Sequence, residues 1–259
     1  MLILWGLSMI YCFDQGLKNA DGTFKYTKYD AEYFRNEGSE VTFVFIPLLS
    51  TIDMEQIYRN LKIKNETIIG LYTGFTGNTI TPISYTVDDL INSLEDKNYR
   101  DMELDYSHRF SFYNDSYLDA YYSDESKRFI KEAHLYSKGH LTRKDFYSHG
   151  LIFSEFYRQK DTKDCLYSRR FYSPNRNSSF DEIITNNNSK YIFDETIIES
   201  QKALIELMLE QLHIKKEDTV ILDYDHECLQ EILLYSNSAN LLMTRSSSAM
   251  DMMNERFNF

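Results

Sequence analysis

The chain has few cysteines and fewer basic than acidic residues, and each shortage excludes a class of protein. Its three cysteines, at positions 12, 165 and 228, lack metal-ligand spacing and are too scattered for a disulfide framework. The 28 lysines and arginines stand against 40 aspartates and glutamates, which gives a net charge of −12. We therefore expect a reducing cytoplasm as the location and no nucleic acid as a partner.

The sequence also lacks a long hydrophobic run. The apolar opening segment, residues 1–13, has no basic start and no small-residue cleavage site. It is far shorter than the roughly 20 residues of a membrane span. We interpret it as a buried first strand rather than a targeting segment, and Met9 is an alternative start of the protein.

Glycine-rich signatures are missing as well. The chain contains no dinucleotide-binding Gly-x-Gly-x-x-Gly, no phosphate-binding loop and no nucleophile elbow, so we expect no cofactor. One loop after the first strand, residues 14–22, carries Gly16 and Gly22, either of which could let backbone amides approach a ligand at the start of a following helix. A plain loop is the alternative interpretation.

Apolar runs predict an α/β architecture at both ends of the chain. Residues 41–46, 67–72 and 219–224 are rich in β-branched and aromatic side chains, which is typical of buried parallel strands. A helix is expected over residues 25–37, where aromatic side chains recur at helical spacing.

A second helix is expected late in the chain, with Leu204 and Met208 on its inner side. Thr196 and Glu199 suggest a capping box ahead of it. The βα pattern thus opens the chain, stops near residue 73 and resumes near residue 194.

The middle of the chain has a different composition. Residues 106–193 hold 20 of the 39 tyrosine, phenylalanine and tryptophan residues in a third of the length. Short aromatic segments alternate there with turn-forming residues, at the spacing of an antiparallel meander. The segments are 128–136, 141–147, 151–157 and 166–172. We predict a β-sheet over roughly residues 100–193 and expect it to be the functional centre of the protein.

The tyrosines of this sheet suggest a binding face. Tyrosine offers rigid, amphipathic contact area, which suits the recognition of polar chains or of another protein. Arg169 and Arg170 are adjacent and should lie on opposite faces of one strand, so we expect one solvated arginine and one that faces a partner. Arg169 and Tyr172 are candidate ligand contacts.

Two further groups of residues could carry chemistry. Histidines 134, 140 and 149 lie beside predicted turns, and solvated or structural roles are favoured over metal binding, so no metal site is predicted. Asp225 and His226 follow a predicted strand, where α/β proteins place ligand-binding residues. An N-cap role for Asp225 is the alternative.

Several segments in a fixed order resemble one known family. The chain resembles the N-terminal half of the accessory Sec system glycosyltransferase, its GtfA subunit, and more remotely the wall teichoic acid glycosyltransferases. The matching segments are Val-Thr-Phe-Val-Phe-Ile-Pro at 41–47, residues 66–82 with 86–90, Gly-His-Leu-Thr-Arg-Lys-Asp-Phe-Tyr at 139–147, Leu-Tyr-Ser-Arg-Arg-Phe-Tyr at 166–172, and Asp-Thr-Val-Ile-Leu-Asp at 218–223.

This resemblance implies an α/β fold: the N-terminal Rossmann-like half of a GT-B glycosyltransferase with an inserted antiparallel β-meander. The expected parts are a first Rossmann-like segment at 1–73, the meander at 74–193 and the Rossmann-like return at 194–259. The family implies a retaining transfer of N-acetylglucosamine from UDP-N-acetylglucosamine to serine or threonine of serine-rich repeat adhesins. It also implies a related partner subunit, GtfB, and a cytoplasmic location, with peripheral association at the inner face of the membrane as a further expectation.

The sequence departs from the family pattern at both ends. Family members continue into a second domain whose Glu-x7-Glu pair contacts the donor, so a UDP-sugar is expected to bind only if such a domain completes this chain. The tail 243–259 and the first loop match the family pattern poorly. A non-catalytic module that binds the partner or the acceptor, left by truncation, is therefore the alternative function.

Overall fold

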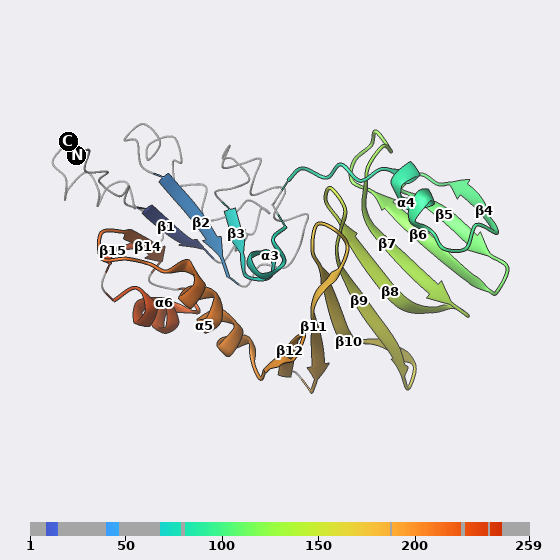
Figure 1. Cartoon of the computed structure of the whole chain (residues 1–259). Helices are drawn as coiled ribbons and strands as arrows, with labels where there is room; N and C mark the ends of the chain where they lie inside the picture. Colours follow the sequence, from blue (N-terminus) through green and yellow to red (C-terminus); the bar gives the residue numbers. More distant parts are fainter. Residues whose placement is uncertain are drawn as a thin grey trace. The chain divides into compact units, whose positions relative to one another are not determined.

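The computed structural model describes residues 9–14, 40–46, 68–78, 81–186, 188–223, 226–237 and 239–244. The chain divides into two compact units, one made of Met1–Phe75 with Leu204–Phe259 and the other of Thr76–Ala203. In Figure 1 the first unit carries the blue and the orange to red elements, and the second carries the green to yellow strands. The helix expected over residues 25–37 lies outside the described residues.

The first unit contains a five-stranded parallel sheet (Figure 1). Its strands are β1 (Met9–Asp14), β2 (Glu40–Phe45), β3 (Ile68–Gly70), β14 (Thr219–Asp223) and β15 (Asn240–Thr244). Phe43, Val44 and Ile221 are fully buried, as expected for a parallel sheet covered on both faces. The runs at 41–46 and 219–224 are therefore confirmed as buried strands.

The order of the strands is β15-β14-β1-β2-β3, so the direction in which the chain adds strands reverses between β1 and β14. In open α/β sheets, ligands bind outside the carboxyl ends of the strands at such a reversal. This topology places the carboxyl ends of β1 and β14 at the position where a ligand is expected.

Three described helices accompany these strands: α3 (Leu71–Thr76), α5 (Gln201–Leu212) and α6 (Leu229–Tyr235). The strand predicted at 67–72 is shorter than expected, because the chain turns into α3 directly after Gly70. Thr73 secures this turn, since its Oγ1 accepts from the Gly70 amide at 3.0 Å and donates to the Gly70 carbonyl at 3.2 Å. None of the helices in the described part of the chain is long and apolar enough to cross a membrane.

The start of α5 corrects one expectation. Leu204 and Met208 are buried as predicted, but the capping box at Thr196 and Glu199 is wrong. Thr196 opens a short strand, β13 (Thr196–Ile198), and the Ser200 hydroxyl accepts the Ala203 amide at 3.2 Å at the start of the helix. Because residues 196–198 pair with a neighbouring strand, they do not form the helix start that the local sequence predicts.

The second unit is built on a ten-stranded antiparallel sheet whose strands follow one another in chain order from β4 to β13 (Figure 1). The other strands are β4 (Tyr99–Glu103), β5 (Ser107–Phe112), β6 (Ser116–Tyr122), β7 (Ile130–Ser137), β8 (His140–Tyr147), β9 (Leu151–Lys160), β10 (Lys163–Tyr172), β11 (Ser178–Thr185) and β12 (Asn188–Phe193). The predicted antiparallel sheet is confirmed.

The turn between β7 and β8 shows why neighbouring strands pair. Lys138 and Gly139 both have positive φ, at 49° and 82°. Two central residues with positive φ define a type I′ turn, whose twist matches that of the flanking strands. The glycine therefore supports the tight connection predicted from the Ser-Lys-Gly sequence.

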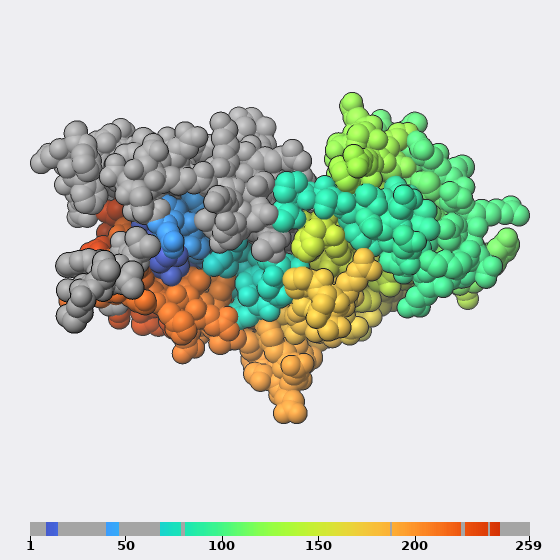
Figure 2. Space-filling model, turned by 45° about the horizontal axis from the view of Figure 1, so that its top comes forward, coloured from blue at the N-terminus to red at the C-terminus, as the bar shows by residue number. Residues whose placement is uncertain are grey.

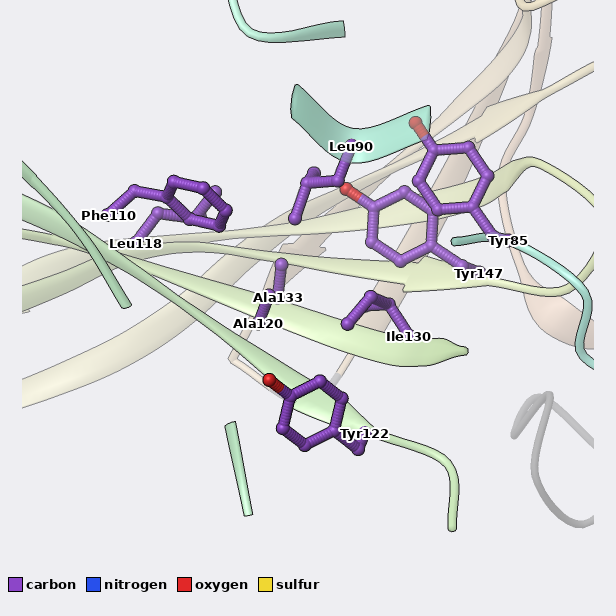
Figure 3. Packing of buried hydrophobic residues seen from close by; sticks show 9 residues of the cluster. All are labelled: Tyr85, Leu90, Phe110, Leu118, Ala120, Tyr122, Ile130, Ala133 and Tyr147. Carbon is purple, nitrogen blue, oxygen red and sulfur yellow. The ribbon is translucent and has the colours of Figure 1, made fainter. Parts of the chain in front are cut away.

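One face of β5–β8 packs on helix α4 (Val87–Ser93) and the segment before it. Figure 3 shows the cluster, in which Leu90 of α4 lies above the small side chains of Ala120 and Ala133. The rings of Tyr85 and Tyr147 stack with centroids 4.4 Å apart. The segment that carries α4 lies on the surface of the unit (Figure 2, blue-green) and covers this face of the sheet.

Candidate functional site

Six charged side chains and one histidine form one row across the ten-stranded sheet. Each member lies directly opposite the next on the neighbouring strand, so all of them point to the same face. The charged row comprises Arg109, Asp119, His134, Lys144, Glu155, Arg169 and Glu182. The row extends from β5 to β11, on the face opposite to the one that α4 covers.

Arg169 is the centre of the most buried part of the row. Its guanidinium contacts Glu155 at 3.0 Å and Glu182 at 2.8 Å. The exposed fractions of the side chains are 19% for Arg169, 11% for Glu155 and 3% for Glu182. Burial acts to lower the pKa of Arg169, but the two carboxylates outweigh it and raise that pKa. The arginine is thus held in its charged form by neighbours in the sheet.

Hydroxyl groups satisfy the remaining carboxylate oxygens of this triad. Tyr157 donates to Glu155 at 2.5 Å, while Ser189 and Tyr191 donate to Glu182 at 2.5 and 3.2 Å. A buried ion pair is tolerated when further hydrogen bonds satisfy its lone pairs. The triad is therefore a closed structural network.

Four tyrosines lie along the charged row, and we call them the tyrosine group. The tyrosine group comprises Tyr117, Tyr121, Tyr136 and Tyr157, all of them partly exposed. Tyr117 stacks on Tyr136 with centroids 4.7 Å apart, and the ring of Tyr121 lies 4.6 Å from that of His134.

Arg109 supports the tyrosine group from β5. Its guanidinium lies 4.5 Å above the ring of Tyr117 and forms two hydrogen bonds with Asp119, at 2.6 and 2.7 Å. The charges of Arg109 and Arg169 are therefore both matched within the sheet. This face offers a ligand ring surface and phenolic hydroxyls, together with the ammonium group of Lys144, which lies 5.6 Å from the centroid of the Tyr157 ring.

Arg170 and Tyr172 lie on the other face of the sheet. Arg170 is 45% exposed and forms a bidentate pair with Asp181, at 2.8 and 2.9 Å. The Tyr172 hydroxyl lies 3.3 Å from Ser154 Oγ, which donates to the buried Asp145 at 2.5 Å. Burial raises the pKa of Asp145, and the nearby Arg143 only partly opposes that shift. Arg169 and Tyr172 therefore do not form one site.

His226 follows β14 at the carboxyl edge of the parallel sheet and is 4% exposed. Its Nδ1 accepts the Cys228 amide at 3.1 Å, which places the proton of the neutral ring on Nε2. Burial lowers the pKa of His226 to about 4, and the Asp14 backbone opposes this shift to a smaller extent. The ring is thus a neutral hydrogen-bond donor at ordinary pH.

Two polar atoms in this turn lack partners. Within the described residues, the buried Asp223 Oδ1 has no hydrogen-bond partner, and the buried His226 Nε2 has none of good geometry, although the Asp14 backbone is close enough to affect the pKa of the ring. One atom is a donor and the other an acceptor, and both lie at the carboxyl end of β14, beside the reversal of strand order. Such a pair can hold the hydroxyl groups of a polar ligand.

Two predicted site residues, Gly16 and Asp225, lie outside the described residues. The N-cap position of α6 is Cys228, so the cap expected at Asp225 is not found at this helix. Ligand contacts by Arg169, Tyr172 and His226 stay predictions. Glu155 and Glu182 were not identified from the sequence, because only the strand register brings them beside Arg169.

The three histidines considered for metal binding each lie beside a polar side chain. His134 lies 3.1 Å from Glu132, His140 lies 3.2 Å from Asp164, and His149 lies 3.5 Å from the Thr81 hydroxyl. In the part of the chain that the structure describes, no three metal-ligating side chains gather.

Comparison with known proteins gives a consistent relationship. A family model for the GtfA extended beta-sheet domain matches residues 101–195. The UDP-N-acetylglucosamine–peptide N-acetylglucosaminyltransferase GtfA subunit of Streptococcus agalactiae is 31% identical over 235 residues, which are 90% of this chain and 46% of that protein. The GtfA subunit of Streptococcus pneumoniae is 28% identical over 240 residues, 90% of this chain and 47% of that protein.

Solved structures agree with these relatives. The crystal structure of the pneumococcal O-GlcNAc transferase GtfA in complex with UDP and GlcNAc matches with a TM-score of 0.82 at 26% identity, over 92% of this chain and 48% of that one. A GtfA/B complex matches with the same TM-score and identity, over 91% and 48%. TarM, at 14% identity and a TM-score of 0.61, shares the fold.

The antiparallel sheet, joined to a parallel α/β unit, therefore places the chain among proteins with the architecture of these glycosyltransferases. More specifically, the chain is GtfA-like and corresponds to the N-terminal half of such subunits. It spans about half the length of the curated relatives it matches.

Proposed function

We propose that this chain is the N-terminal part of a glycosyltransferase that transfers N-acetylglucosamine from UDP-N-acetylglucosamine to serine or threonine of serine-rich repeat adhesins. The parallel unit is the Rossmann-like half of a GT-B enzyme, and the ten-stranded sheet is the insertion in it. The protein works in the cytoplasm, with peripheral association at the inner face of the membrane. A UDP-sugar binds only when a second domain completes the chain.

The observation that carries this proposal is the tyrosine group beside the charged row, on a sheet that matches the GtfA extended beta-sheet domain. The arginines of the row are paired within the sheet, so a bound polypeptide meets chiefly aromatic rings and hydroxyls. That surface chemistry suits a neutral, hydroxyl-rich acceptor. We infer that the sheet also binds a related GtfB-like partner subunit, since a GtfA/B complex is among the solved structures that this chain resembles.

The carboxyl edge of the parallel sheet contributes a second contact. His226 supplies a neutral N–H donor and Asp223 a carboxylate oxygen, at the strand reversal where α/β proteins bind ligands. Their role is to orient hydroxyl groups of the bound sugar or acceptor. The chemical step itself depends on donor-binding groups of a second domain.

Substitution in the tyrosine group tests acceptor binding. Tyr136→Ala is expected to weaken binding of a synthetic serine-rich peptide about tenfold, because tyrosine contacts at the centre of an interface contribute about 1–2 kcal/mol. Tyr113→Ala is the matched control, since Tyr113 lies between β5 and β6 and is 77% exposed. Isothermal titration calorimetry measures both variants, and an equal loss in the two would count against the proposed face.

A transfer assay tests the enzymatic part of the proposal. The chain alone is expected to transfer no radiolabelled N-acetylglucosamine to a serine-rich peptide, whereas the chain complemented with a GtfA second domain and a GtfB partner should do so. Transfer by the chain alone would contradict the need for a second domain. A complemented chain that binds the partner in a pull-down but transfers nothing would instead support a non-catalytic binding module.

A further inference from the structure

Asn78 stands out in the ten-stranded unit because it is buried and incompletely hydrogen-bonded. It follows Gly77, whose φ is +70°, in the segment after α3, and it is 8% exposed. The candidate sites described above do not use it. Its surroundings nevertheless fix how its side-chain amide is oriented.

Three hydrogen bonds hold this residue. The side-chain Nδ2 donates to the Tyr172 carbonyl at 2.6 Å and to Thr76 Oγ1 at 3.0 Å, and the backbone amide lies 3.3 Å from the same Thr76 oxygen. A carbonyl oxygen can only accept, so the amide cannot be flipped without placing two oxygens against each other. The side-chain oxygen of Asn78 is therefore assigned with certainty by its neighbours.

That oxygen, Asn78 Oδ1, is buried and has no hydrogen-bond partner among the described residues. A buried acceptor without a donor costs about 1–3 kcal/mol, so such an atom in a native protein calls for an explanation, of which a functional contact is one. The preceding residue, Gly77, faces open space, because a Cβ atom built on it would meet no atom within 4 Å. The residue is thus held rigidly with an acceptor atom left open.

We propose that Asn78 Oδ1 is a ligand-contacting atom that accepts a hydrogen bond from a hydroxyl group of the bound substrate. This inference rests on the proposed function. A neutral amide oxygen selects a donor without selecting charge, which fits a hydroxyl from either of two sources, a serine or threonine of the acceptor or N-acetylglucosamine. The contact makes Asn78 a residue that discriminates ligands with a hydroxyl from those without.

The test compares ligands that differ by one hydroxyl. Wild-type chain and Asn78→Ala are titrated with a serine-rich peptide, with the same peptide carrying alanine in place of serine, and with N-acetylglucosamine. The wild type is expected to prefer the serine peptide about 3- to 10-fold, the contribution of one neutral hydrogen bond. Asn78→Ala should lose this preference and keep its affinity for the alanine peptide, because a merely structural effect would weaken both peptides equally.

The control and the second variant keep the test decisive. Asn92→Ala, on the exposed side of α4, should behave as the wild type. Asn78→Ser replaces Asn78→Ala if the latter does not fold, with the same expected result.

Loss of N-acetylglucosamine binding with an unchanged peptide preference would assign the contact to the sugar. Unchanged binding of both ligand types in a folded variant overturns the inference alone, whereas a wild-type chain that binds neither overturns acceptor binding as well.

Discussion

Replacing Arg169 with methionine is expected to lower the free energy of unfolding of the ten-stranded unit by about 3–5 kcal/mol. Methionine keeps much of the apolar stem but leaves Glu155 and Glu182 without their shared cation. The side chain of Glu182 is only 3% exposed, so water cannot take the place of the guanidinium. Denaturant unfolding followed by circular dichroism, with hydrogen exchange of β10 and β11, measures the loss.

The adjacent arginine provides a matched control. Arg170→Met removes the same charge from the same strand, but its pair with Asp181 is on the opposite face and Arg170 is 45% exposed. Exposed pairs contribute less than about 1 kcal/mol, so this variant should be nearly as stable as the wild type. Adding Glu155→Gln and Glu182→Gln to Arg169→Met should recover part of the lost stability. Equal effects of the two single substitutions would show that the triad is no more important than a surface pair.

The contrast between these two arginines also shows which features of the site can be predicted from the sequence and which cannot. Strand alternation alone predicts that Arg169 and Arg170 face opposite sides. It does not predict which side is buried or which carboxylates are opposite, because those depend on the register of three strands. Register shifts, such as the one between Leu166 and Ser168, change the pairing by a single residue and leave no mark in the sequence.

The parallel strands were easier to predict than the sites beside them. An apolar run such as that around Phe43 predicts a strand buried on both faces, because the prediction depends only on the residues of the run itself. The position of His226 depends instead on β14 pairing with β1, two strands that are far apart in the chain. A strand followed by a histidine could be found from sequence, but the unpartnered Asp223 Oδ1 and Asn78 Oδ1 follow only from tertiary packing.

Acid is expected to destabilise the parallel unit through His226. The pKa of this ring is lowered from 6.5 to about 4 in the folded chain, chiefly by burial. Above pH 6.5 the ring is neutral in both states and the shift has no effect. Between pH 6.5 and pH 4 the unfolded chain binds the proton more readily, so the free energy of unfolding falls as the pH falls. The expected loss between pH 7 and pH 5 is about 2 kcal/mol.

Substitution of the ring isolates this contribution. His226→Gln removes the titrating group, so its stability should fall about 2 kcal/mol less than that of the wild type between pH 7 and pH 5. His213→Gln is the control, because it replaces a histidine that is exposed at the end of α5, outside the buried turn of His226. Unfolding at both pH values, followed by hydrogen exchange of β14, gives the comparison. A wild type and a His226→Gln variant with parallel pH profiles would mean that the ring is not buried in neutral form, and the donor assigned to Nε2 would then be lost as well.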